Sequence, residues 1–93
     1  MMKLENNLST NSNEVEMSIR GIHERIYHIR TEVIDCSRDV LAKSLKVGRS
    51  TIQNYENGTR EPSASFLVSL SSLAGVHIEW LMTGKGAKLT RDQ

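Results

Sequence analysis

The 93-residue sequence has few of the residues on which several protein classes depend. Its one cysteine, Cys36, excludes an internal disulfide framework, so a small secreted disulfide-stabilised protein is not expected. With one Trp, two Tyr and one Phe, the core must be mainly aliphatic. No stretch approaches the roughly 18 apolar residues of a membrane span, and no signal peptide is recognisable. The sequence therefore predicts one soluble, cytoplasmic domain.

Residues in patterns suited to catalysis or metal binding are also scarce. Cys36 has no base near it in the sequence and is expected to be a small buried hydrophobic residue. His23 and His28 lie on the first predicted helix and His77 on the last, without the spacing of metal ligands or a Cys or acidic cluster. The sequence has neither a Gly-rich phosphate loop nor paired catalytic carboxylates. We therefore expect no enzyme activity, no metal and no cofactor.

The sequence also has no large excess of positive or negative charge, because 12 Lys and Arg are balanced by 11 Asp and Glu. The formal net charge of +1 identifies no partner, so only local charge is informative. Residues 38–60 hold five basic residues against two acidic ones, whereas residues 1–17 hold one lysine against three glutamates. Because residues 1–17 are rich in Asn, Ser and Thr, we expect a flexible polar arm there, not a basic arm that follows nucleic acid.

Apolar residues recur in steps of three and four from residue 18 onward, which predicts helices. The first is expected to begin after an N-cap at Ser18 and to end near Glu32, with Val33 and Ile34 fraying its end. A second follows a cap at Ser37, with Val40, Leu41, Ala42 and Leu45 as its apolar positions.

Three more helices are expected, over Arg49–Glu56, from a cap at Ser63 to a stop at Gly75, and over His77–Met82. Phe66, Leu67, Leu70, Leu73 and Ala74 are the apolar positions of the fourth. There is no strand pair and no internal repeat. The prediction is an all-α domain of five short helices over residues 18–86, followed by a tail or the start of a linker over residues 87–93.

Residues 38–57 are expected to form a helix-turn-helix unit. A small residue, Ala42, stands where two helices joined by a short turn would cross, and the second of these helices can enter a DNA major groove. The outward positions of that helix hold hydrogen-bonding side chains and no acid, whereas a merely solvated face would usually mix in Asp or Glu. The candidate base-contacting residues are Arg49, Ser50, Thr51, Gln53 and Asn54, and the candidate phosphate-contacting residues are Arg38, Lys43, Lys46, Asn57 and Arg60.

Simpler roles stay open for several of these residues. Gln53 and Asn54 could contact only water or phosphate, and Ser50 and Thr51 fit either role equally. Lys43 fits a solvated residue better than a contact.

Residues about 19 to 84 resemble the Cro/C1-type (Xre) group of phage-repressor helix-turn-helix domains. The resemblance rests on SRDVLAKSLKVGRSTIQNYENGTREPS and LAGVHIEWLMTGKG. It implies that Arg38 contacts phosphate, that Arg49, Ser50, Gln53 and Asn54 contact bases, and that Asn57 and Arg60 contact the DNA backbone. It also implies that Arg30 pairs with Glu56.

Three departures from the family pattern qualify this resemblance. Lys46 stands where the turn usually has Gly, and since a left-handed Lys costs on the order of 1 kcal/mol, we expect the turn to differ locally. The segment between Arg30 and Arg38 is one residue longer than common, which makes the Arg30–Glu56 pair less certain. Arg38 replaces a frequent Gln.

The sequence thus predicts a sequence-specific, double-stranded DNA-binding transcriptional regulator of the bacterial nucleoid, a phage- or prophage-type repressor that binds an inverted-repeat operator as a homodimer. Trp80, Leu81 and Met82 are candidate dimer contacts, with Trp80 better suited to the core. One alternative is an antitoxin or regulator that mainly engages a toxin or antirepressor protein. Another is an interaction module that has lost DNA binding. The chain could also be the N-terminal part of a longer repressor.

Overall fold

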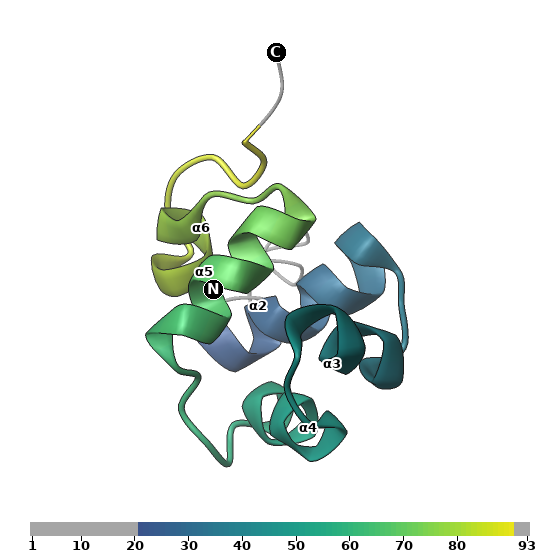
Figure 1. The fold of residues 1–93 in the computed structure, drawn as a ribbon. Helices are drawn as coiled ribbons and strands as arrows, with labels where there is room; N and C mark the ends of the chain where they lie inside the picture. The colour runs from purple at the N-terminus through teal and green to yellow at the C-terminus, as the bar shows by residue number, and fades with distance from the viewer. Residues whose placement is uncertain (1–20, 91–93) are drawn as a thin grey trace, which may run out of the picture.

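The computed structural model describes residues 21–90, and Figure 1 shows their helices packed around one core. The helices are α2 (Ile22–His28), η1 (Ile29–Ile34), α3 (Arg38–Leu45), α4 (Arg49–Asn57), α5 (Ala64–Ala74) and α6 (Ile78–Thr83). Because η1 continues α2 without a break, residues 21–90 contain five helices and no strand, which confirms the all-α prediction. The expected cap at Ser18 and the expected arm over residues 1–17 lie outside the described residues.

The first helix ends differently from the prediction. Its last part, η1, is a π-helix, in which each backbone N–H bonds five residues back and each turn therefore holds more residues. Val33 and Ile34 lie inside this π-helix and pack against the core, so the predicted fraying after Glu32 is wrong. Their apolar contacts favour continuing the helix up to Asp35, which ends it in a left-handed conformation with a φ of 62°.

The predicted caps of α3 and α5 are confirmed. The hydroxyl of Ser37 accepts a hydrogen bond from the N–H of Val40 at 3.2 Å, and the hydroxyl of Ser63 accepts one from the N–H of Phe66 at 3.1 Å. Each bond satisfies one backbone donor that the first turn of a helix leaves without a partner. Gly75 ends α5 with a φ of 70°, as its position in the sequence predicts.

The core draws side chains from every helix. The rings of Tyr55 and Phe66 meet edge to face with centroids 4.7 Å apart, while most of the other core residues are aliphatic, as expected. Val40 and Leu73, two of the apolar positions of their helices, are 52% and 48% exposed and lie outside the core. The buried hydrophobic residues are Ile26, Ile29, Leu41, Ala42, Ile52, Tyr55, Phe66, Leu67, Leu70, Val76, Trp80 and Leu81.

The segment after α6 folds back on the domain. Val76 and Leu89 form an isolated antiparallel bridge, which the sequence did not predict. The N–H of His77 donates to the carbonyl oxygen of Lys88 at 2.8 Å. The N–H of Thr90 donates to the carbonyl oxygen of Gly75, also at 2.8 Å. Residues 88–90 therefore contact the helical domain, while the role of residues 87–93 as a linker stays a prediction. Within residues 21–90 no helix has the length and hydropathy needed to cross a membrane.

Candidate nucleic-acid interface

Helices α3 and α4 form the predicted helix-turn-helix unit, with α4 at one end of the domain (Figure 1). Ala42 on α3 is buried, as expected of the small residue at the crossing. Lys46 follows α3 with φ 59° and ψ 44°, the left-handed conformation that glycine adopts most easily. The N–H of Val47 then donates to the Ala42 carbonyl oxygen at 3.0 Å. The expectation that Lys46 changes the turn is therefore wrong, because the lysine itself takes the strained left-handed conformation.

The two sides of α4 differ sharply. Ile52, Tyr55 and Glu56 are buried against the other helices. The predicted base-contacting positions lie on the opposite side, which is open to solvent. Arg49, Ser50 and Gln53 are exposed, and Thr51 and Asn54 are half-buried. The positions chosen from the sequence thus share one outward face of one helix, and their role as base contacts stays a prediction.

Arg49 has a partner that sequence reasoning missed. Its Nε lies 3.0 Å from Oδ1 of Asp39 on α3, and both side chains are largely exposed. Arg49 is the first residue of α4 and Asp39 is the second residue of α3, so the short turn brings these two helix starts together. The sequence signal was weak, because ten residues separate the pair.

Thr59, just after α4, organises the amides at the end of the outward face. Its hydroxyl lies 3.2 Å from Oδ1 of Asn54 and 2.8 Å from Oδ1 of Asn57, and its N–H donates to Asn57 Oδ1 at 3.2 Å. The amide oxygens of both asparagines therefore lie toward Thr59, in contacts that are exposed to solvent. A bidentate contact from Asn54 to adenine would use the same oxygen, which has two lone pairs and can accept a second hydrogen bond.

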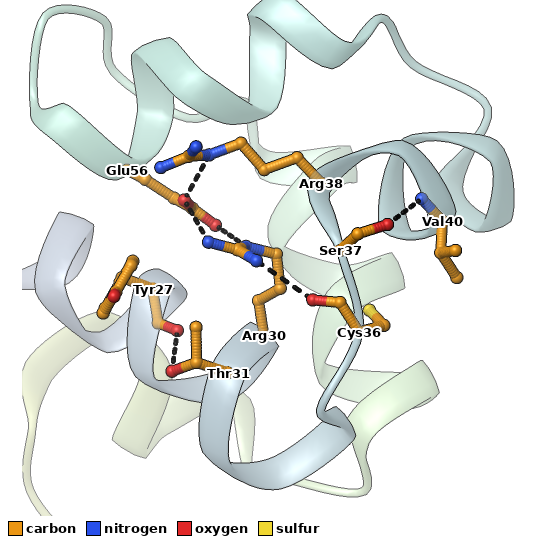
Figure 2. Close-up of polar contacts among 8 residues, drawn as sticks. All are labelled: Tyr27, Arg30, Thr31, Cys36, Ser37, Arg38, Val40 and Glu56. Atoms are coloured by element: carbon orange, nitrogen blue, oxygen red, sulfur yellow. Dashed lines mark hydrogen bonds and ion pairs between the residues drawn. The ribbon is translucent and has the colours of Figure 1, made fainter.

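A buried ionic cluster holds α4 against the first helix (Figure 2). The Nε and Nη2 of Arg30 donate to Oε2 and Oε1 of Glu56 at 2.6 and 3.1 Å, and Nη1 donates to the Cys36 carbonyl oxygen at 3.0 Å. The hydrogen bond to Glu56 raises the pKa of Arg30. These contacts confirm the predicted Arg30–Glu56 pair, and the longer segment between Arg30 and Arg38 includes most of the π-helix η1 and Asp35.

Arg38 belongs to the same cluster. Its Nε donates to Oε1 of Glu56 at 2.9 Å, and 32% of its side chain is exposed (Figure 2). The other predicted phosphate contacts are exposed side chains on or near α3 and α4: Lys43, Lys46, Asn57 and Arg60. Arg38 thus differs from the others, because Glu56 fixes its guanidinium at the edge of this surface.

Arg25 is a structural residue that the sequence reasoning overlooked. It is 3% exposed, and its Nε and Nη2 donate to the carbonyl oxygens of Leu81 and Met82 at 2.7 and 3.0 Å. Burial lowers its pKa. Because these oxygens belong to the last turn of α6, Arg25 ties that helix end to α2. The signal was present, since Arg25 follows Ile22 by three residues on the apolar face of its helix.

The three candidate dimer contacts lie in different environments. Trp80 and Leu81 are buried in the core, with Trp80 only 6% exposed. Met82 is 53% exposed, so it alone of the three offers a free surface. Dimer formation itself stays a prediction.

Cys36 and the candidate metal ligands were considered separately in the sequence. Cys36 is a free, half-buried thiol whose pKa is raised chiefly by burial, which disfavours the nucleophilic thiolate. Within residues 21–90, no three His, Cys, Asp or Glu residues lie together in a way that could hold a metal ion.

Comparison with known proteins identifies the family of this domain. A family model described as helix-turn-helix matches residues 35–81, which include α3, the turn, α4 and α5. The chain belongs to this helix-turn-helix family, of the Cro/C1 type. It is also 46% identical over 44 residues to an uncharacterized HTH-type transcriptional regulator of Haemophilus influenzae. That match covers 47% of this helix-turn-helix chain and 18% of the relative. No solved structure matches the chain.

Proposed function

We propose that this helix-turn-helix protein is a sequence-specific, double-stranded DNA-binding transcriptional regulator. The observation that carries the proposal is the outward face of α4, where exposed or half-buried hydrogen-bonding side chains stand together without an acid. Such a face suits the pattern of donors and acceptors in the major groove. The similarity to a relative named as a transcriptional regulator supports the same function.

Binding would use two kinds of contact. Arg49 at the start of α4 would donate to guanine O6 and N7, while Ser50, Thr51, Gln53 and Asn54 would line the groove behind it. Cationic side chains around α4 would neutralise phosphates and set the orientation of the helix. These are Arg38, Lys43, Lys46 and Arg60, together with the neutral amide of Asn57.

The regulator would act as a phage- or prophage-type repressor. One recognition helix contacts few base pairs, so a specific site ordinarily needs two copies whose helices enter successive major grooves about 34 Å apart. A homodimer on an inverted-repeat operator that overlaps a promoter would exclude RNA polymerase sterically. Met82 is the exposed apolar residue among the candidate dimer contacts.

Selection from a random duplex library at moderate salt tests this function. The expected result for the purified protein is enrichment of an inverted repeat. No enrichment, with only salt-sensitive uniform binding, would contradict the proposal and favour the alternative in which the domain engages a protein partner.

Two arginine variants then separate base contacts from phosphate contacts. Arg49→Ala should lose about 1–3 kcal/mol of binding free energy and relax the choice of base at one position of the half-site. Arg60→Ala should weaken binding to all sequences alike, because a phosphate contact carries no sequence information. Titration of each variant against single-base operator variants measures both effects. Equal losses for Arg49→Ala on every duplex would contradict its role.

A further inference from the structure

The contact between Asp39 and Arg49 lies on the surface that would face DNA. The two side chains come from the starts of α3 and α4, with Arg49 Nε 3.0 Å from Asp39 Oδ1. The exposed fractions are 57% for the Arg49 side chain and 70% for that of Asp39. An ion pair this exposed adds little to folding stability, although the Asp39 carboxylate also lies in the first turn of α3, where it complements the helix dipole.

An acid at this place is costly for DNA binding taken alone. Its charge lies beside a surface expected to meet phosphates, where it weakens the attraction that Lys43 and Lys46 provide. It does, however, compensate Arg49, whose positive charge stands at the electropositive start of α4. Arg49 is therefore a side chain on which the Asp39 carboxylate acts directly, in addition to its effect at the start of α3.

The geometry of the contact leaves a defined part of Arg49 available. A guanidinium has five N–H donors in a planar fork, and the Asp39 carboxylate lies next to the Nε of Arg49. The two terminal nitrogens, Nη1 and Nη2, lie at the far end of this fork. That end matches the two adjacent acceptors of guanine, O6 and N7, and not the donor–acceptor pair of adenine.

We propose that Asp39 is a positioning residue that determines specificity, because it holds the Arg49 guanidinium with its terminal nitrogens directed to a guanine. This inference rests on the proposed DNA-binding function and adds to it the residue that restricts Arg49 to one base. Without the carboxylate, the long arginine side chain can turn to a phosphate or to another base with an acceptor. Asp39 thus lowers affinity for DNA in general and raises discrimination at one position.

Asp39→Asn tests the proposal, because it removes the charge at nearly constant shape. In the library selection and in titrations of single-base operator variants, the preference for guanine at the Arg49 position should fall by about fivefold. Affinity for an unrelated duplex should rise about two- to threefold, since one negative charge leaves the surface. Glu61→Gln is the matched control: it removes one exposed carboxylate near α4 and should raise affinity without changing any base preference.

The effect must also depend on Arg49. In an Arg49→Ala background, Asp39→Asn should produce no further change in base preference, which a double-mutant cycle measures. Asp39→Glu, which keeps the charge, should retain part of the guanine preference. Circular dichroism of each variant establishes that α3 and α4 remain folded.

The outcomes are distinguishable. If the unaltered protein enriches no sequence, the proposed function fails and this inference fails with it. If it enriches an operator but Asp39→Asn keeps the same base profile, as Glu61→Gln does, the function stands and the positioning role of Asp39 is overturned.

Discussion

Glu56 is a buried charged residue that connects α4 to two other segments. Its side chain is 2% exposed and accepts hydrogen bonds from Arg30 and Arg38. A carboxylate so far removed from water is tolerated because two guanidinium groups compensate it. One acid therefore links the first helix, the start of α3 and the end of α4.

Removing this charge should be costly. We expect Glu56→Gln to lower the free energy of unfolding by about 3 kcal/mol, because the guanidinium of Arg30 would stay buried without its carboxylate. Urea denaturation measures the loss, and Glu61→Gln, at an exposed carboxylate, should stay within about 0.5 kcal/mol of the unaltered protein. Equal stability of the two variants would mean that the cluster relaxes or admits water.

The sequence predicted some of these single-residue contacts and missed others. Steps of three and four placed the candidate base contacts on one face of α4, because helix geometry alone decides that relationship. The partners Asp39 and Thr59 were not foreseen, since contacts between separate segments depend on how the turn and the end of α4 are folded. The spacing from Ile22 places Arg25 on the apolar face of its helix, but it does not identify the carbonyl oxygens of α6 that the buried guanidinium binds.

Among the elements, the turn between α3 and α4 carries local strain. Lys46 adopts a left-handed conformation that places its Cβ close to the backbone, and a cost of about 1–2 kcal/mol is typical. The π-helix η1 is a second irregularity, and it ends in another left-handed residue that is not glycine, Asp35. Asp35 lies shortly before α3 and Lys46 directly after it. The placement of α3 therefore depends on both left-handed residues.

The same substitution should have opposite effects at two nearby lysines. Lys46→Gly should raise the free energy of unfolding by about 0.5–1 kcal/mol, because relief of the left-handed strain exceeds the extra entropy of the unfolded chain. Lys43→Gly, inside α3, should lower it by about 1 kcal/mol. Thermal and urea unfolding compare the two. A loss at Lys46 as large as at Lys43 would show that the turn is not strained.

Element boundaries were predictable where a cap determines them and less so elsewhere. Ser37, Ser63 and Gly75 supply local hydrogen bonds or backbone freedom, and the helices begin or end there as expected. The end of the first helix was not predictable, because packing of Val33 and Ile34 against the core outweighs the low helix propensity of these β-branched residues.

For the whole molecule, the segment after α6 closes the side of the domain formed by α2 and α6. Lys88 lies with its Nζ 3.0 Å from His28 Nε2 and 5.6 Å from the centroid of the Trp80 ring. Burial, and next the charge of Lys88, lower the pKa of His28 below its ordinary value of 6.5, while Glu32 acts in the opposite direction. The imidazole is therefore favoured as the neutral acceptor of the lysine.

The stability of the domain should consequently depend on pH through His28. The unfolded chain binds a proton at a higher pH than the folded protein does, so this contribution is fully present above about pH 6.5 and decreases as the pH falls below it. Urea midpoints at pH 7.5 and pH 5.5 should differ more for the unaltered protein than for His28→Gln. An equal decrease in both would assign the pH dependence to other groups.

The position of the single tryptophan has a practical consequence. Trp80 is buried on α6, edge to face with His28 and beneath Lys88, whereas α4 lies at the other end of the domain (Figure 1). Its fluorescence emission is therefore an intrinsic reporter of global unfolding and of the contact that closes the α6 side. Because the ring is remote from the outward face of α4, occupancy of that face has to be followed with a probe placed on the nucleic acid.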